Sequence, residues 1–292
     1  MFGERPVVID GKDWARSTVH ELKSVVATRQ SKRQRIEILD LTRFGLSLWI
    51  DGWPQFAMLD EHRYHQLLVL PALFYHPHPA DVLILGGGDY LAAWRVLMRR
   101  GVSYVKIADW DRMVAVLVLA HMPAVEKLGA HLDPRVDFST EIDATEYLPA
   151  TEERYDAIIG DLTDLTTLGE IPPDFAEHIF RILKPGGVFV TQAGELSLAE
   201  KPLVHLTKSI EPFQGRFQSV WLSGYHIESF AYTQAFLTVW KDRVVEPYLP
   251  RQKDLSKKFD LRMLRQDRPF YSPAIHRAAF TIDPRIKATL GV

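Results

Sequence analysis

The stretch DVLILGGGDYLAAWRVLMRR, residues 81–100, decides the fold. It opens with an apolar run, VLIL, of the kind found in strands that are covered on both faces of a parallel sheet. Three glycines and an aspartate then allow a tight turn, and a helical pattern follows to Arg100. A strand, a glycine turn and a helix in this order indicate the first unit of an α/β sheet.

The same alternation continues toward the C-terminus. Strand patterns lie at residues 104–109, 136–143, 155–161 and 188–192, and helical patterns separate them, ending near residues 128 and 183. Two late strand patterns, 217–222 and 235–240, predict an antiparallel pair at the sheet edge, and the charged tail 254–292 is partly helical. We therefore predict an α/β fold with a Rossmann-like, doubly wound sheet.

The residues before this stretch predict a smaller unit. Residues 1–30 read as a polar, partly helical arm. Strand patterns at 35–40, 44–52 and 55–59, with the turn dipeptide Asp51-Gly52, predict a small antiparallel β domain. A helix follows from Glu61 to Tyr75, with Asp60 as its N-cap. The segment HPHPAD marks a boundary near residue 78, which divides the chain into domains 1–77 and 78–292.

Composition excludes several classes of protein. The chain has 292 residues, 47% of them hydrophobic, and a net charge of -2, which argues against nucleic-acid binding because phosphate contacts need a basic surface. The absence of cysteine excludes disulfides, thiolate zinc sites and cysteine nucleophiles. The N-terminus has no apolar core, and the longest apolar run, residues 114–120, is too short to span a membrane. We expect a cytoplasmic protein.

Carboxylates follow four strands of the predicted sheet, where ligands bind in doubly wound folds. In the first turn, Gly86 and Gly88 allow the backbone to approach a ligand, but no third glycine follows. Asp89 there would repel a phosphate and attract an amine or a sulfonium. A helix-capping role for Asp89 explains the residue equally well. Asp109 lies about 20 residues further on, where a carboxylate binds ribose hydroxyls in such folds.

Two further strand ends add acidic groups. Asp143 has the position to accept a hydrogen bond from an adenine amino group, although a plain loop acid explains it as well. Asp161 and Asp164, in the segment DLTD, predict an acidic pocket beside Asp89 for a cationic substrate such as a polyamine. One of these carboxylates can orient an amine and help to remove its proton. Both can also be helix-capping loop acids.

Other chemistry has little support. His65 is the one histidine near the predicted site, and a lone histidine is more often structural than catalytic. The 11 histidines have no HExxH spacing, so we expect no metal, and no GxSxG segment supports hydrolase chemistry. The tryptophans are expected in the core or at interfaces, although one can stack on adenine or face a sulfonium; those nearest the predicted site are Trp49, Trp53, Trp94 and Trp110.

Taken together, these segments resemble the spermidine synthase (polyamine aminopropyltransferase) family over residues 33–282. RQRIEI resembles its YQ-x-I stretch, and FGLSLWIDGWPQFAMLDEHRYHQ its FGxxLxLDGxxQxxxxDExxYHE. GGGD, DWD, DPRV, the single aspartate before EYL, YDAIIGDLTD, KPGGVFVTQAGE and FYSPAIHRAAF follow in the family's order. The resemblance implies a sheet like that of class I methyltransferases and a homodimer or homotetramer.

The resemblance also implies a reaction. An amine attacks the methylene next to the sulfonium of decarboxylated S-adenosylmethionine, and 5′-methylthioadenosine leaves. Asp161 would position and deprotonate the amine, and Asp89 would hold the aminopropyl ammonium. Contacts to the donor are further implied for Gln34, His65, Gly86, Gly88, Asp109 and Asp143, and contacts to the acceptor for Tyr64, Gln66, Asp164, Gln192 and Tyr225.

The chain departs from the family at several positions. Tyr90 and Leu91 replace the last two glycines of GGGDGG, which would narrow or reshape the floor near the transferred group. The proline after DLTD is missing, and the tyrosine of the family's PTYP segment falls on Ser229. We expect an altered acceptor: a longer or branched polyamine, agmatine, or an amine of another kind.

Two alternatives remain open. The first is an N-methyltransferase that uses intact S-adenosylmethionine, with Arg95 or Arg99 binding the donor's carboxylate, because fold alone does not fix function. The second is a non-catalytic paralogue, which the lost glycines favour and the retained Asp161 opposes.

Overall fold

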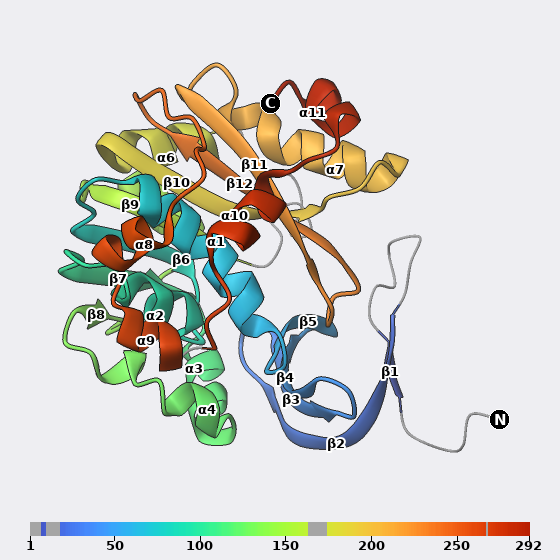
Figure 1. Cartoon of the computed structure of the whole chain (residues 1–292). Helices are drawn as coiled ribbons and strands as arrows, with labels where there is room; N and C mark the ends of the chain where they lie inside the picture. Colours follow the sequence, from blue (N-terminus) through green and yellow to red (C-terminus); the bar gives the residue numbers. More distant parts are fainter. Residues whose placement is uncertain (1–6, 10–17, 163–173, 267) are drawn as a thin grey trace.

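The computed structural model describes residues 7–9, 18–162, 174–266 and 268–292. It contains two sheets, one small and antiparallel and one large and mixed (Figure 1). The small sheet has the order β1-β2-β3-β4-β5. Its strands are β1 Val7–Ile9, β2 Val19–Gln30, β3 Arg35–Leu41, β4 Gly45–Ile50 and β5 Trp53–Ala57.

The N-terminal arm was predicted wrongly. Residues 19–30 form the 12-residue strand β2, not a helical arm. β2 is mostly exposed, so its sequence lacks the alternation of a half-buried strand, and its stability comes from antiparallel pairing with β3. The predicted hairpin between β4 and β5 is confirmed, with Asp51 and Gly52 both at positive φ in the turn.

The large sheet has the order β11-β12-β10-β9-β6-β7-β8, which is a doubly wound arrangement with β6 near its centre. β6, β7, β8, β9 and β10 pair in parallel, and β12 pairs with β10 and β11 in antiparallel fashion. The strands are β6 Asp81–Gly86, β7 Tyr104–Ala108, β8 Val136–Asp137, β9 Tyr155–Asp161, β10 Leu183–Glu195, β11 Ser219–Ile227 and β12 Tyr232–Trp240.

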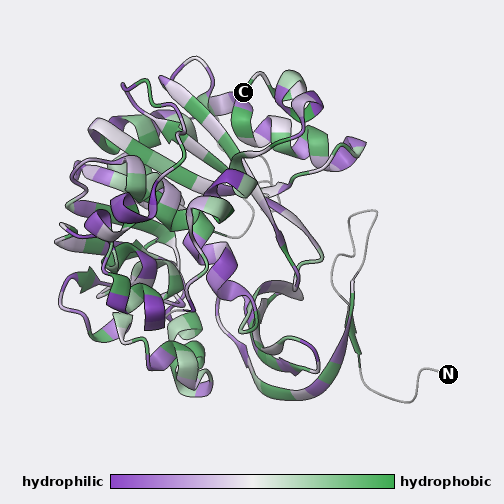
Figure 2. Cartoon of the chain, viewed as in Figure 1, coloured by the Kyte–Doolittle hydropathy of each residue, from purple (hydrophilic) through white to green (hydrophobic). Residues whose placement is uncertain are grey.

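Helices cover both faces of this sheet (Figure 1). Alternate residues of β6 show why: Val82 and Ile84 pack in one core cluster, and Leu83 and Leu85 pack in the other. Figure 2 shows hydrophobic residues along the central strands and mixed colouring on the surrounding helices. The helices are α1 Glu61–Tyr75, α2 Leu91–Leu97, α3 Arg112–His121, α4 Pro123–Glu126, α5 Ala144–Ala150, α6 Phe175–Ile182, α7 Glu200–Ile210, α8 Gln252–Lys258, α9 Leu261–Gln266, α10 Pro273–Phe280 and α11 Pro284–Leu290.

Helix α1 belongs to the packing of the large sheet. Its side chains are almost all buried, and it contacts α2 and the strands β10, β11 and β12. We therefore propose that the domain boundary lies before α1 and not at residue 77. Asp60 is the N-cap residue of α1, as predicted, but its side chain makes no capping hydrogen bond. Its carboxylate instead accepts hydrogen bonds from the backbone N–H (2.8 Å) and hydroxyl (2.8 Å) of Ser229.

One predicted strand is much shorter than expected. Only Val136 and Asp137 pair with β7, and the backbone then turns toward the carboxyl end of that strand, where the N–H of Ile142 donates to the carbonyl of Asp109 (2.9 Å). This turn brings residues 142–145 over the sheet edge that carries the glycine loop. None of the described helices has the length and apolarity that a membrane crossing requires.

Candidate active site

The glycine loop sits where the strand order of the sheet reverses. β7 lies on one side of β6 and β9 on the other, and Gly86 pairs with Asp161 at their carboxyl ends. Gly86 has φ +76°, and a side chain there would collide with the carbonyl of Asp161. A Cβ on Gly88 would lie 2.8 Å from a carboxylate oxygen of Asp109. Glycine at these positions therefore lets three strand ends meet.

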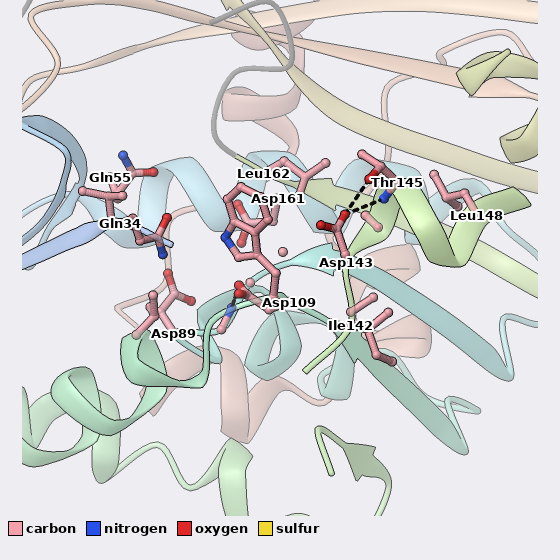
Figure 3. A pocket seen from close by; sticks show the side chains of 18 of the residues that line it. Gln34, Gln55, Asp89, Asp109, Ile142, Asp143, Thr145, Leu148, Asp161 and Leu162 are labelled. Atoms are coloured by element: carbon pink, nitrogen blue, oxygen red, sulfur yellow. Dashed lines mark hydrogen bonds between the residues drawn. The ribbon is translucent and has the colours of Figure 1, made fainter. Parts of the chain in front are cut away.

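Asp109 is fixed beside this loop (Figure 3). One carboxylate oxygen accepts the N–H of Gly88 (2.9 Å) and the other accepts the N–H of Asp111 (2.9 Å). Burial raises the pKa of Asp109 to about 6, and the nearby negative charges of Asp111 and Asp161 act in the same direction. The two hydrogen bonds lower the pKa but do not outweigh burial. The carboxylate is thus presented to the cavity at the predicted ribose position.

Asp89 combines a helix-capping contact with a place in the cavity wall. One of its oxygens accepts the N–H of Leu91 (2.8 Å) and so caps α2, yet the residue also lines the cavity. Burial raises the pKa of this carboxyl group, and the charge of His65 opposes the rise. A cation near Asp89 would therefore be stabilised.

Asp143 lies at the far end of the cavity, on the turn that leaves β8. Its carboxylate accepts hydrogen bonds from the N–H (3.0 Å) and hydroxyl (2.7 Å) of Thr145 and caps α5. Ile142 and Leu148 lie beside it in the cavity wall (Figure 3). An apolar wall with one acceptor suits a flat heterocycle that carries an amino group. Trp110 also lines this region, whereas Trp49 and Trp94 are buried elsewhere.

Asp161 is the least satisfied carboxylate of the site. Its Oδ1 accepts the Tyr64 hydroxyl at 3.4 Å, and its Oδ2 is buried without a hydrogen-bond partner among the described residues. The Nε2 of His65 lies 3.8 Å from this Oδ2. Burial, together with the charge of Asp89, raises the pKa of Asp161 to about 6. Ligand atoms of His65, Asp89 and Asp161 all lie within 4.8 Å of one another, so the group can surround one cation.

The cavity as a whole is acidic. Among the described residues, its ionisable lining side chains are five aspartates, two histidines and a tyrosine, with no lysine or arginine. Both sheets contribute to the wall. The lining comprises Gln34, Leu48, Ile50, Gln55, Tyr64, His65, Gly86, Gly87, Gly88, Asp89, Ala108, Asp109, Trp110, Val114, Ile142, Asp143, Ala144, Thr145, Leu148, Pro149, Asp161, Leu162, Asp174, Phe175 and His178.

A family model described as "Spermine/spermidine synthase domain" matches residues 61–246, which is more than half of the chain. A polyamine aminopropyltransferase of Korarchaeum cryptofilum is 30% identical over 282 residues, covering 94% of this chain and 84% of the relative. One of Thermococcus onnurineus is 30% identical and covers 89% of this chain and 88% of the relative.

The chain belongs to the spermine/spermidine synthase family. Its fold is also that of the spermidine synthase from Thermotoga maritima, which is 22% identical with a TM-score of 0.77 over 95% of this chain and 90% of that one. A spermidine synthase in complex with the transition-state analogue AdoDATO has the same identity and TM-score, over 95% and 92% of the two chains. The predicted family, fold and enzyme class, an aminopropyltransferase, are confirmed.

Not all residues that the family resemblance implied lie in the cavity. Gln66 follows Tyr64 and His65 on α1, but its side chain points to the C-terminal segment: its carbonyl oxygen accepts the N–H of Tyr271 (2.8 Å) and of Phe270 (3.2 Å). It is not among the described lining residues, so the structure does not support an acceptor role for it.

Two other residues that the resemblance implied for the acceptor, Gln192 and Tyr225, also lie outside the described cavity lining. Gln192 accepts hydrogen bonds from Gly194 (3.1 Å) and Gln234 (3.2 Å), and Tyr225 packs edge-on against Phe270 at 5.1 Å. Neither lines the cavity. Asp164 lies outside the described residues.

Tyr90 and Leu91, which replace glycines of the family motif, also lie outside the described cavity lining. Tyr90 occupies the left-handed region (φ +68°), but its ring packs against His131 and Phe138 and does not line the cavity. Leu91 is fully buried in the cluster between α3 and the small sheet. The expectation that these residues reshape the cavity floor is therefore wrong. Ser229 is bonded to Asp60, as described above, and also lies outside the lining.

Arg95 and Arg99 do not offer a charge to the donor. Arg95 is fully buried and donates to both carboxylate oxygens of Glu61, at 3.0 and 2.9 Å. Arg99 donates to backbone carbonyls, including those of Leu73 and His76 (2.9 Å each). The suggestion that either binds a donor carboxylate is wrong. The Glu61–Arg95 pair itself was missed from the sequence, because its partners are far apart in the chain and meet only through helix packing.

Proposed function

We propose that this chain transfers the aminopropyl group of decarboxylated S-adenosylmethionine to an amine and releases 5′-methylthioadenosine. The observation that carries the proposal is the buried, unsatisfied oxygen of Asp161 among the described residues, in a cavity whose described lining has five aspartates and no lysine or arginine. Such a cavity favours reactants that each carry a positive charge. Asp143 lies at one end of it, and Asp89, Asp161 and His65 lie together beside the glycine loop.

The donor occupies the end formed by the glycine loop. Asp109 accepts the ribose hydroxyls, and Asp143 accepts from the adenine amino group, with Ile142 and Leu148 against the ring. Gly86 and Gly88 allow the close approach, and Gln34 borders the same cavity from the small sheet. Asp89 binds the aminopropyl ammonium, because its second oxygen is not used by the cap of α2.

The decarboxylated donor is favoured over intact S-adenosylmethionine. Intact donor carries an α-carboxylate, and the described lining offers no lysine or arginine to pair with it beside Asp89 and Asp161. Calorimetric titration with both donors tests this point. Tighter binding of the carboxylated form would support the methyltransferase alternative.

Asp161 positions and deprotonates the attacking amine. An alkylamine with a pKa near ~10.4 is mostly protonated at neutral pH, and freeing its lone pair costs roughly 4 kcal/mol. Alignment of two bound reactants can lower the barrier by as much as ~7–11 kcal/mol, so geometry is the larger contribution. Tyr64, hydrogen-bonded to Asp161, fixes the orientation of the carboxylate.

We propose that the acceptor is a primary amine. Leu48 and Ile50 give the wall of the small sheet an apolar surface, and Gln55 adds one amide. Methylthioadenosine release should be followed with decarboxylated donor and a panel of putrescine, longer and branched polyamines, and agmatine. Asp161→Asn should abolish release while donor binding persists. No release with any amine would support the non-catalytic alternative instead.

We further propose that the chain forms a homodimer or homotetramer. Strands β1 and β2 at the edge of the small sheet expose apolar side chains that a second copy can cover: Val7, Val19, Val25 and Val26. Light scattering on the purified protein would give the mass directly, and a monomer at all concentrations would exclude the proposal.

A further inference from the structure

Three buried side chains lead from the centre of α2 to the base of the cavity. Arg95 donates to the carboxylate of Glu61 (3.0 and 2.9 Å), and the same carboxylate lies 3.1 Å from Nδ1 of His65. This Nδ1 also lies 2.9 Å from the backbone carbonyl of Glu61. His65 is 2% exposed, Glu61 5% and Arg95 0%, so all three groups are shielded from water.

The two acceptors at Nδ1 fix the histidine tautomer. A carbonyl and a carboxylate both require a donor, so Nδ1 carries a hydrogen. In the neutral ring, Nε2 then has a free lone pair, and it lies 3.8 Å from Oδ2 of Asp161. That oxygen is the one without a hydrogen-bond partner in the described part of the chain. The imidazole therefore presents a proton acceptor toward Asp161.

The proposed reaction needs such an acceptor. The amine arrives as an ammonium and gives one proton to Asp161. Its nitrogen lone pair then forms the new C–N bond, while the C–S bond breaks and its electron pair stays on sulfur. The product nitrogen is again an ammonium, so one proton is released for each turnover. Asp161 must pass this proton on before the next turnover, and Nε2 of His65 is a basic nitrogen 3.8 Å from its Oδ2. The proton then leaves His65 through the cavity that both residues line.

We propose that Nε2 of His65 takes this proton from Asp161, and that Glu61 and Arg95 are positioning residues which hold the imidazole for that role. The inference rests on the proposed role of Asp161. The 3.8 Å separation requires the two groups to approach within hydrogen-bond reach, or a bridging water, when the reactants are bound.

The charges around His65 support this role. Facing the ring or its partners are Glu61 and Tyr64 from α1, Asp89 from the glycine loop, Asp161 from β9 and, across Glu61, Arg95 from α2. Burial alone would lower the pKa of His65, but the hydrogen bond to Glu61 and the charges of Asp161 and Asp89 outweigh it and raise the pKa. Burial would likewise raise the pKa of Glu61, but Arg95 and His65 lower it to about 2, so Glu61 stays ionised.

The first test does not depend on turnover. The pKa of His65 is measured by NMR titration of histidine-labelled protein, and His65→Gln identifies the signal. The test variant is Glu61→Gln with Arg95→Met, because removal of both charges leaves no unpaired buried ion. The pKa of His65 should fall in this variant. The lost carboxylate of Glu61 contacts the ring and stabilises its charged form, whereas the lost guanidinium of Arg95 lies farther away, beyond Glu61. A matched control, Glu153→Gln with Lys106→Met, removes an ion pair (2.8 Å) that does not touch His65.

The second test measures turnover with the amine that the panel identifies. His65→Gln should lower kcat by about 100-fold, as expected for a lost proton acceptor. The double variant should lower kcat by roughly tenfold and move the acid limb of kcat/KM to lower pH, with a smaller change in KM. An unchanged kcat in His65→Gln, or a pKa of His65 that is the same in the double variant, would overturn the proposal. If no amine reacts, the proposed function fails, and the NMR titration still decides the positioning roles.

Discussion

Replacing Asp161 with asparagine should stabilise the protein while it abolishes turnover. The side chain of Asp161 is 9% exposed, and burial raises its pKa from an ordinary value of 3.8 to about 6. Above pH 6 the folded protein holds a charge that the unfolded chain accommodates more easily in water. A rise of this size in the pKa corresponds to about 3 kcal/mol at ~1.36 kcal/mol per pKa unit. Asparagine has the same shape and can still accept the Tyr64 hydroxyl.

The sign of the effect depends on pH. A raised carboxyl pKa means that the folded state binds more protons than the unfolded state between pH 3.8 and 6. The wild type therefore loses stability as pH rises through this window, and asparagine does not. The advantage of Asp161→Asn should be full at pH 7.5, roughly half as large at pH 5, and nearly absent below pH 4.

Thermal unfolding of both proteins at pH 7.5 and pH 5 measures this difference. A gain of about 3 kcal/mol corresponds to a rise in Tm of very roughly 5–10 °C for a domain of this size. Asp143→Asn is the matched control, because it lines the same cavity and asparagine caps helices about as well as aspartate. The reasoning is refuted if Asp161→Asn is no more stable than wild type at pH 7.5, or if its advantage is equally large at pH 5.

Three other outcomes follow from the site. Since Asp161 acts as a carboxylate and His65 as a neutral base, log kcat/KM should fall toward acid pH with a slope that exceeds one below about pH 6, which a pH profile with saturating donor would show. Asp109→Ala should weaken methylthioadenosine binding at least ~tenfold by calorimetry, because the fixed acceptor for the ribose is lost. Gln66→Ala should cost about 1–3 kcal/mol in denaturant unfolding but leave KM for the amine unchanged, because it leaves the N–H groups of Phe270 and Tyr271 without their acceptor.

The position of the site could be predicted because it depends on topology. In a doubly wound sheet, residues at the carboxyl ends of neighbouring strands must meet, so Gly86, Asp109 and Asp161 come together whatever their side chains do. Asp143 is an instructive variant. Its expected strand stops at Asp137, yet Asp143 reaches the site. The backbone turns after the strand, and the N–H of Ile142 donates to the carbonyl of Asp109 at the end of β7.

Side-chain direction on α1 could not be predicted in the same way. Tyr64, His65 and Gln66 are consecutive, and on a helix consecutive side chains point about 100° apart. The first two line the cavity, and Gln66 contacts the C-terminal segment, whose path crosses α1 more than 200 residues later in the chain. A sequence motif that joins three neighbours does not reveal which of them faces the ligand.

The glycine replacements show the same limit for backbone conformation. Tyr90 keeps the left-handed conformation (φ +68°) that glycine adopts without strain, so the loop retains its shape and the side chain is directed away from the cavity toward Phe138. A larger residue in a loop changes a site only if its Cβ points into it. The altered acceptor was inferred partly from this replacement, and that support is lost.

The buried Arg95 determines which carboxylates near the cavity keep an unpaired negative charge. Asp89, Asp161 and Glu61 lie close together, and three carboxylates without a counter-charge would drive one another toward protonation. Arg95, which does not line the cavity, neutralises Glu61, and Glu61 in turn contacts His65, whose Nε2 lies 3.8 Å from Asp161. The remaining negative charge is thereby concentrated on Asp89 and Asp161. These are the two positions where the proposed reaction brings an ammonium group, one from each reactant.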